Sequence, residues 1–378
     1  MSSTTGANGD DLAAILGHLG ALVADDSQNP PRTITAESAM FAHVRSVLPD
    51  DFQVETVDHG DGHVTLHARR GAPGVLFNCH LDTVPVGTGW TVPPLALTVR
   101  EGRAWGRGTC DIKGAAAALL RVAETTDAPM ALLFTSDEEG AGGCCVDRFI
   151  RAGGTEGRGV AVICEPTGNR AVLSHRGYLS VKGRFEGRAG HSSEFRALED
   201  SAVHAAGRWM AAALAHCKAE ADAGRATCFN IGTVSGGLKS NVIADGCDLH
   251  WSARLAPGGD NRALFDALAG LAGAGDRADW HIPFSGPPLP AAGGSADGAR
   301  RFAERQELEI TESVDFWTEA SLFSAAGLDA LVLGPGHIEQ AHIVDEWVAL
   351  DQLERACGQY RVIVERDGGS ERDAGRTA

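Results

Sequence analysis

Residues 75–82 read VLFNCHLD. The stretch begins with residues that favour a buried β-strand and ends on His80, two residues before Asp82. In open α/β sheets, functional side chains collect just beyond the carboxyl ends of the strands. His80 is therefore placed to bind a ligand, and Asp82 is near enough to accept the proton of its second ring nitrogen. A single histidine of this kind is more often only solvated, so the hypothesis depends on whether the pattern recurs.

The same pattern recurs at three further apolar stretches. Glu139 follows the stretch at residues 130–136, and Glu165 follows the stretch at residues 160–164. The stretch at residues 330–333 is followed by a glycine-rich turn and then by His342. A glycine-rich loop at residues 106–114 adds Asp111, just before an alanine-rich helix. The loop lacks the last glycine of a dinucleotide-binding fingerprint, which argues against a dinucleotide site. Four strands that end beside histidine or carboxylate predict an α/β sheet with metal ligands along one edge.

The candidate ligands are two histidines and three carboxylates: His80, Asp111, Glu139, Glu165 and His342. Imidazole and carboxylate without thiolate suit zinc, cobalt, manganese or nickel. Five ligands exceed the needs of one tetrahedral zinc with an open position. They fit two ions that share a carboxylate, with Asp111 as the natural bridge, although the set also allows one tightly bound ion.

Glu138 precedes the candidate ligand Glu139. Two adjacent carboxylates cannot easily face one metal, so we expect one to bind and the other to accept the proton of the nucleophilic water. A metal centre with such a base predicts hydrolysis of an amide or an ester. A dipeptidase or aminopeptidase on the same site is one alternative. A metal-binding regulatory protein without catalysis is another, and the intact Glu138 argues against it.

Composition narrows the class of protein. The chain has 378 residues, which favours two domains, and a net charge of −17, which argues against a nucleic-acid partner. No apolar span is long enough for a membrane helix, and the polar first ten residues show no secretory signal. Nine cysteines without a CxxC pair argue against both a disulfide framework and a thiolate zinc site, so we expect a cytoplasmic protein.

The pattern of apolar and polar residues changes between residues 171 and 287. Alternating strand patterns and two helical patterns, the longer at residues 197–221, follow one another in β-α-β-β-α-β order. This order predicts a small α+β sandwich inserted into a larger domain formed by residues 1–170 and 288–378. The polar ends, residues 1–10 and 365–378, are expected to be disordered.

Six motifs then carry a family resemblance. They are HLDTVP (80–85), GTCDIKG (108–114), SDEEG (136–140), CEPT (164–167), GRAGHSS (187–193) and LGPGHIEQAHIVDE (333–346). In order and over nearly the whole chain, they resemble the dizinc amidohydrolases that include aminoacylase, succinyl-diaminopimelate desuccinylase and acetylornithine deacetylase. The resemblance implies a mixed-sheet, dizinc aminopeptidase-like catalytic domain with an inserted ferredoxin-like lid and dimerisation domain, and a homodimer.

The resemblance also implies residue roles. One divalent ion, zinc or cobalt, would be held by His80, Asp111 and Glu165, and a second by Asp111, Glu139 and His342. Glu138 would be the general base and later the proton donor to the leaving amine, with Asp82 behind His80. His191 would stabilise the oxyanion from the smaller domain, in many members from the partner subunit. The substrate-binding residues would be Asn241, Arg254, Gly334 and Gly336, the two glycines through backbone amides.

The substrate follows from two blocks of sequence. The GPG-x-I-x-QAH block resembles the acetylornithine deacetylase branch, and residues 314–321, VDFWTEAS, are most similar to the N-acetylcitrulline deacetylases of a variant arginine pathway. We therefore expect hydrolysis of N-acetyl-L-citrulline to L-citrulline and acetate in arginine biosynthesis. N-acetyl-L-ornithine is the alternative, and its ammonium group would need a carboxylate in the pocket, for which Asp315 and Glu319 are the candidates.

Overall fold

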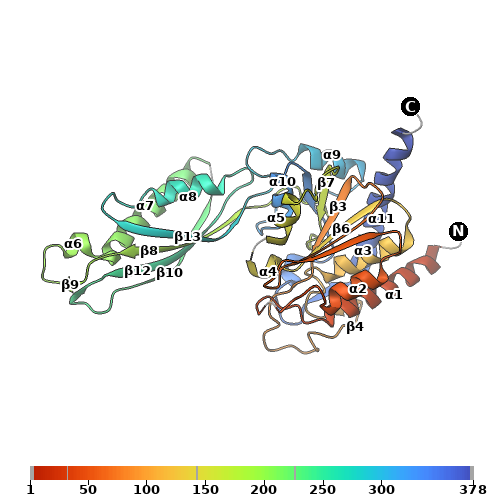
Figure 1. Cartoon of the computed structure of the whole chain (residues 1–378), viewed down its shortest axis with the longest axis horizontal. Helices are drawn as coiled ribbons and strands as arrows, with labels where there is room; N and C mark the ends of the chain where they lie inside the picture. Colours follow the sequence, from red (N-terminus) through yellow and green to blue (C-terminus); the bar gives the residue numbers. More distant parts are fainter. Residues whose placement is uncertain (1–3, 32, 142–143, 225–226, 375–378) are drawn as a thin grey trace. The chain divides into compact units, whose positions relative to one another are not determined.

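The computed structural model describes residues 4–31, 33–141, 144–224 and 227–374 (Figure 1). The chain divides into two compact units. Unit 1 comprises Met1–Leu173, Ala296–Ser313 and Thr318–Ala378, and unit 2 comprises Ser174–Ser295 with Val314–Trp317. The smaller unit is therefore an insertion into the larger one.

Unit 1 contains a six-stranded mixed sheet. Its strands, in spatial order, are β1 (Gln53–Asp58), β2 (Val64–Arg70), β6 (Met130–Thr135), β3 (Val75–His80), β7 (Val160–Ile163) and β14 (Asp329–Val332). The first two pairings are antiparallel, and β6, β3, β7 and β14 run parallel. The mixed α/β fold class is confirmed. The four parallel strands are those expected from the sequence, so their carboxyl ends meet at one edge of the sheet.

The residues of β3 alternate between the two faces of this sheet. Val75, Phe77 and Cys79 belong to the main hydrophobic core, where the ring of Phe77 meets Tyr360 edge-on at 5.4 Å. His80 has the opposite parity and points away from that core. Helices pack around the sheet: α1 (Thr4–Val23), α2 (Ala39–Val47), α3 (Lys113–Thr125), α5 (Cys144–Arg151), α9 (Asp297–Arg305), α10 (Ala320–Ala325) and α11 (Leu350–Ala374). A small sheet of β4 (Thr98–Arg100), β5 (Arg103–Trp105) and β15 (Trp347–Ala349) completes unit 1.

The two ends of the chain are more helical than the sequence suggested. The expected disorder of residues 1–10 and 365–378 is wrong for the described part, because α1 begins at Thr4 and α11 continues to Ala374. Buried residues anchor both helices, for example Leu19 in α1 and Tyr360 in α11. Once a helix has nucleated, its extension into polar residues requires little further free energy. Of the helices in the described ranges, none is both long and apolar enough to span a bilayer.

Unit 2 is a four-stranded antiparallel sheet with two main helices (Figure 1). Its strands, in spatial order, are β10 (Cys228–Gly236), β12 (Gly246–Arg254), β8 (Tyr178–Glu186) and β13 (Arg277–Gly286), and its main helices are α7 (Ala202–Asp222) and α8 (Asn261–Ala269). The elements follow one another as β-α-β-β-α-β, which is the predicted ferredoxin-like order. The helix expected at 197–221 is interrupted at Ser201, leaving α6 (Ala197–Asp200) as a separate turn.

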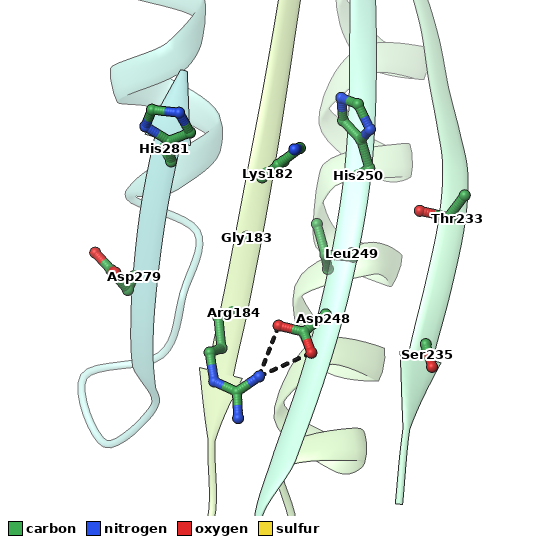
Figure 2. Close-up of a pocket in the computed structure, with 10 residues that line it drawn as sticks. All are labelled: Lys182, Gly183, Arg184, Thr233, Ser235, Asp248, Leu249, His250, Asp279 and His281. Atoms are coloured by element: carbon green, nitrogen blue, oxygen red, sulfur yellow. Dashed lines mark hydrogen bonds and ion pairs between the residues drawn. The ribbon is translucent and has the colours of Figure 1, made fainter. Parts of the chain in front are cut away.

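The two faces of the unit 2 sheet differ in polarity. Apolar side chains such as Val181 and Phe185 pack on Trp209 of α7. The opposite face is polar and lines an open hollow of about 390 Å³, in which Arg184 donates to both carboxylate oxygens of Asp248 at 2.8 Å (Figure 2). The alternation of side chains along each strand accounts for this division.

Candidate metal centre

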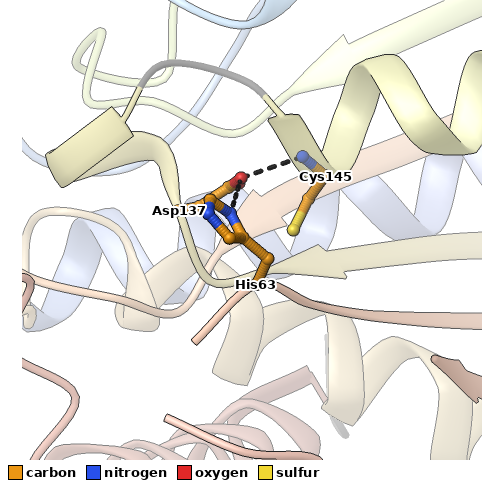
Figure 3. Close-up of side chains that lie close together, drawn as sticks. All are labelled: His63, Asp137 and Cys145. Carbon is orange, nitrogen blue, oxygen red and sulfur yellow. Dashed lines mark hydrogen bonds and ion pairs between the residues drawn. The ribbon is translucent and has the colours of Figure 1, made fainter. Parts of the chain in front are cut away.

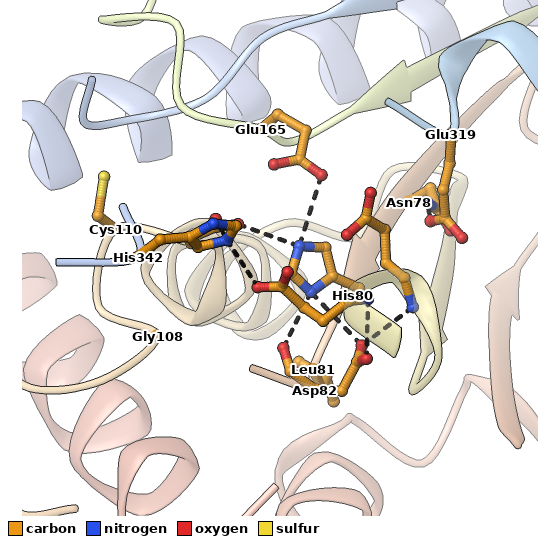
Figure 4. Close-up of polar contacts among 12 residues, drawn as sticks. Asn78, His80, Leu81, Asp82, Gly108, Cys110, Glu165, Glu319 and His342 are labelled. Carbon is orange, nitrogen blue, oxygen red and sulfur yellow. Dashed lines mark hydrogen bonds and ion pairs between the residues drawn. The ribbon is translucent and has the colours of Figure 1, made fainter. Parts of the chain in front are cut away.

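His80 lies at the carboxyl end of β3 and faces two carboxylates (Figure 4). Its Nε2 is 3.1 Å from Asp111 Oδ1 and 3.5 Å from Glu165 Oε1. Its Nδ1 is 3.0 Å from the backbone carbonyl oxygen of Asp82 and 3.5 Å from the Asp82 carboxylate. The shorter contact of Nδ1 is therefore with the main chain of Asp82, whereas the sequence suggested the side chain.

His342 closes the other half of the site. Its Nε2 is 3.1 Å from Asp111 Oδ2 and 3.1 Å from Glu139 Oε1. The two oxygens of Asp111 thus face different histidines, Oδ1 facing His80 and Oδ2 facing His342. This is the arrangement that a bridging carboxylate requires.

The structure brings all five predicted ligands together. The ligand atoms lie within 4.8 Å of one another in each of two overlapping sets, one of His80, Asp111 and Glu165 and the other of Asp111, Glu139 and His342. Each set offers one imidazole and two carboxylates, and Asp111 is common to both. The geometry accommodates two ions that share Asp111.

The charge of the site fits divalent cations. Among the described residues, the ion-pair partners of Asp111, Glu139 and Glu165 are all histidines. Burial raises the pKa of Glu139 to about 6, and the Asp111 carboxylate adds to the rise. Hydrogen bonds to Asp111 and Glu139 raise the pKa of His342 to about 11. Three buried carboxylates without lysine or arginine need positive charge at their centre, and oxygen and imidazole donors suit zinc, cobalt or manganese.

Glu138 and Glu139 form the start of the short helix α4 (Glu138–Ala141), and Asp82 positions both of them. The Asp82 carboxylate accepts the backbone N–H of Glu138 at 3.3 Å and that of Glu139 at 3.1 Å, and also the Asn29 amide at 2.9 Å. Carboxylate oxygens of Glu138 and Glu139 both come within 4.8 Å of His80. Adjacent carboxylates were expected to diverge more than this, but consecutive residues in a first helical turn can reach the same space.

Glu346 is a residue whose role the sequence did not reveal. It is fully buried, and its carboxylate accepts the backbone N–H groups of Gly108 at 3.0 Å, Cys110 at 2.8 Å and Asp111 at 3.0 Å. The same carboxylate pairs with the buried Arg107 at 2.8 Å. Glu346 therefore fixes the loop that presents Asp111. Its place at the end of the 333–346 motif was the only available signal.

Replacing Glu346 with alanine is expected to destabilise the metal-free protein by about 3–5 kcal/mol, because it leaves the buried charge of Arg107 without its carboxylate partner. Glu346→Gln keeps the shape and is expected to cost less, while still weakening metal retention through the Asp111 loop. Thermal unfolding and metal content after dialysis measure both effects. Glu339→Gln changes an exposed glutamate of the same motif and should alter neither quantity.

The two predicted substrate-binding glycines do not have free amides. The N–H of Gly334 donates to Thr167 Oγ1 at 3.1 Å, and the N–H of Gly336 donates to the side-chain oxygen of Gln352. Both glycines are buried, and a Cβ on Gly334 would lie 2.3 Å from the carbonyl oxygen of Cys164. These N–H groups hold the turn together, and a contact of either glycine with substrate stays a prediction.

Three of the other predicted residues, His191, Asn241 and Arg254, belong to unit 2. His191 is exposed on β9 (Gly190–His191), which pairs with β11 (Val242–Ile243), and its Nδ1 is 2.8 Å from Ser193 Oγ. Asn241 lies beside His191, because its backbone carbonyl oxygen accepts the backbone N–H of Ser192 at 3.2 Å. Arg254 stacks 3.9 Å from the ring centre of Tyr178. The structure thus brings His191 and Asn241 together, and the roles of all three residues toward substrate stay predictions.

The two candidate carboxylates for an ammonium group have other partners. Asp315, in unit 2, is highly exposed and pairs with Arg176 at 2.8 Å. Glu319, in unit 1, is 1 % exposed and accepts the Asn78 amide at 2.5 Å (Figure 4). Burial, with the nearby Asp137 carboxylate, raises the pKa of Glu319 to about 8.

Comparison with known proteins places the chain among metallopeptidases and deacetylases. The sequence model of peptidase family M20/M25/M40 matches residues 76–366. The N-acetyl-L-citrulline deacetylase of Xanthomonas campestris pv. campestris is 47% identical over 366 residues, which cover 94% of this chain and 98% of that protein. The acetylornithine deacetylase of Proteus mirabilis is 30% identical over 345 residues, covering 83% and 85%.

Solved structures share the fold at low sequence identity. Aminopeptidase PepT from Bacillus cereus superposes with a TM-score of 0.70 at 17% identity, covering 94% of this chain and 98% of that one. A dinuclear metal-binding peptidase of family M20 from Bacillus subtilis gives a TM-score of 0.63 at 15% identity, covering 96% and 98%. These two similarities support the observed architecture.

Proposed function

Because the chain belongs to peptidase family M20/M25/M40, we propose that it is a metal-dependent amidohydrolase that converts N-acetyl-L-citrulline to L-citrulline and acetate. The observation that carries the substrate is the 47% identity, over 94% of the chain, to a protein with that activity. We further propose that this reaction serves arginine biosynthesis and that the protein is cytoplasmic. The resemblance inferred from the motifs is confirmed at the level of the family.

The proposed metal ligands are His80, Asp111, Glu139, Glu165 and His342, with Asp111 shared between two ions, zinc or cobalt. Divalent ions held there would polarise the acetamide carbonyl and lower the pKa of water. The chain itself supplies the proton transfers and the positioning.

Glu138 is the proposed general base. It takes a proton from the attacking water as the carbon–oxygen bond forms, and it returns that proton to the nitrogen as the carbon–nitrogen bond breaks. Asp82 positions Glu138 by accepting its backbone N–H, and it holds Glu139 in the same way. His191 is the proposed donor to the oxyanion of the tetrahedral intermediate, with Asn241 and Arg254 as further substrate contacts.

The contacts of Asp315 and Glu319 favour a neutral side chain on the substrate. An ornithine ammonium needs an accessible carboxylate, whereas Asp315 pairs with Arg176 and Glu319 is 1 % exposed. The ureido group of citrulline is uncharged and makes no such demand. Both observations therefore support acetylcitrulline over acetylornithine.

Steady-state kinetics on the two acetylated substrates test the proposal. We expect kcat/KM for N-acetyl-L-citrulline to exceed that for N-acetyl-L-ornithine at least about tenfold, which corresponds to about 1.4 kcal/mol. A preference for acetylornithine would reverse the ranking. Turnover of unblocked dipeptides without turnover of either acetylated substrate would instead indicate a dipeptidase.

A homodimer is the proposed assembly, formed through unit 2. Among the described residues of unit 2, seven large apolar side chains are exposed: Phe195, Leu198, Val203, Leu214, Val234, Leu238 and Val242. Self-association through a two-fold axis would cover apolar surface of this kind and the open edges of the sheet. We expect light scattering to give the mass of a dimer. An active sample that contains only monomer would exclude a catalytic role for His191 of the partner subunit.

A further inference from the structure

Three side chains outside the metal centre meet behind the turn that carries Glu138. His63 lies in the turn between β1 and β2, Asp137 follows β6, and Cys145 lies in α5. His63 Nδ1 is 2.7 Å from Asp137 Oδ2, and the same oxygen accepts the backbone N–H of Cys145 at 2.9 Å (Figure 3). We call these three residues the His63 cluster.

The cluster has the composition of a metal site of a different kind. One ligand atom from each residue lies within 4.8 Å of the other two. The donors are an imidazole, a carboxylate and a thiol, a set that selects a borderline ion such as Zn²⁺ or Co²⁺ over Mg²⁺ or Ca²⁺. A second observation points to a missing partner. Asp137 Oδ1 is buried and makes no hydrogen bond within the described residues, although a buried carboxylate oxygen normally has one.

We propose that the His63 cluster is an auxiliary metal site that takes Zn²⁺ through His63, Asp137 and Cys145, separately from the centre at His80. No sequence motif marks the cluster, because the chain has no CxxC pair and His63 lies 74 residues before Asp137. The tertiary structure supplies the third donor by packing α5 against β2. The side chain of His63 is 14% exposed and that of Asp137 is fully buried, so the ion would enter from the His63 side.

Zinc binding requires small shifts of the three side chains, in which the 2.7 Å contact between His63 and Asp137 lengthens, and the loss of one proton. Zinc–nitrogen and zinc–sulfur bonds of ~2.0–2.3 Å place ligands around one ion ~3.3–3.8 Å apart. In the neutral His63 ring the proton that bonds Nδ1 to Asp137 moves to Nε2 by exchange with solvent, and Nδ1 then binds the metal in place of that hydrogen bond. The Cys145 thiol, which donates to the Val64 carbonyl oxygen at 3.5 Å, gives its proton to solvent as the zinc–sulfur bond forms. Burial raises the pKa of this thiol, so the site should fill only when zinc is in excess.

Occupancy of the cluster has a consequence for catalysis. Asp137 is bonded to Glu138 in the chain, and its carboxylate holds the N-terminal part of α5 through the N–H of Cys145. Drawing Asp137 toward an ion shifts the backbone that presents Glu138. We therefore expect excess Zn²⁺ to lower kcat reversibly, through a site distinct from the one that supports activity.

Cobalt spectroscopy tests the site without any assumption about the substrate. The centre at His80 contains no thiol among its proposed ligands, so Co²⁺ added beyond its capacity should produce a thiolate-to-cobalt charge-transfer band in the near ultraviolet only if Cys145 binds. We expect the band in the wild-type protein and its loss in Cys145→Ser. His63→Gln, which keeps the thiol, should require about 10–100-fold more cobalt for the same band.

Cys110→Ser is the matched control, because Cys110 is a buried thiol next to the proposed ligand Asp111. It should keep the band. Inhibition by excess zinc should weaken about tenfold or more in Cys145→Ser, measured against the activity of the same variant at limiting metal. Absence of the band in the wild-type protein, or its persistence in Cys145→Ser, would overturn the proposal whatever the substrate proves to be.

Discussion

Replacing Glu138 with glutamine is expected to lower kcat by about 10²–10⁴-fold while the metal content of the protein stays unchanged. Glutamine keeps the size of the side chain and its backbone N–H, so the hydrogen bond to Asp82 at 3.3 Å remains. It cannot accept a proton from water or return one to the leaving amine. The loss should therefore appear in kcat, with little change in KM.

Metal analysis of the same preparation separates loss of the base from loss of the metal centre. Glu37→Gln, at a side chain that is 89% exposed, serves as the matched control and should leave kcat unchanged. Full activity in Glu138→Gln would show that another group is the base. A parallel loss of metal would show that Glu138 is mainly a ligand, which its closeness to His80 makes a meaningful alternative.

Replacing Asp111 with asparagine is expected to remove both ions and to lower activity at least about 10²-fold. Asp111 is the one residue shared by the two ligand sets, and its two oxygens lie 3.1 Å from His80 and 3.1 Å from His342. Asparagine offers one neutral oxygen and one amide group, so it cannot bridge two cations. Glu165→Gln changes only the set of His80, Asp111 and Glu165, so we expect the protein to lose one ion and keep the other.

Metal content by elemental analysis, before and after chelation and addition of zinc or cobalt, measures this difference. The wild-type protein should lose activity on chelation and regain it on metal addition, whereas Asp111→Asn should not recover. Asp147→Asn, at a surface carboxylate that is 47% exposed, controls for the change of charge. Equal metal loss in Asp111→Asn and Glu165→Gln would contradict a bridging role for Asp111.

The features that the sequence predicted well are local or periodic. A buried strand that ends in histidine or a carboxylate can be recognised within ten residues, as at His80 and Glu165, and four such strands lie parallel in the sheet. The β-α-β-β-α-β order of unit 2 is likewise visible as a succession of periodicities. Parallel strands bring their carboxyl ends to one edge, so the convergence of ligands could be inferred before any distance was known.

The features that the sequence predicted poorly depend on contacts between distant segments. Glu346 accepts the N–H of Gly108 across 238 residues of chain, and no local pattern distinguishes such a carboxylate from a surface one. The amides of Gly334 and Gly336 seemed available because glycine-rich turns often bind ligands, yet Thr167 and Gln352 already accept them. Whether a backbone amide is free is a property of the packed structure.

The stretch at residues 75–82 shows both sides of this division. Its composition alone determined that it forms a buried strand with His80 at its carboxyl end, because polarity and strand propensity are properties of the individual side chains. Only the tertiary structure decided that the Asp82 carbonyl oxygen lies closest to Nδ1 of His80, while the Asp82 carboxylate holds the turn of Glu138. Hydrogen bonds are directional and short in range, so their partners are set by how segments pack and not by their order in the chain.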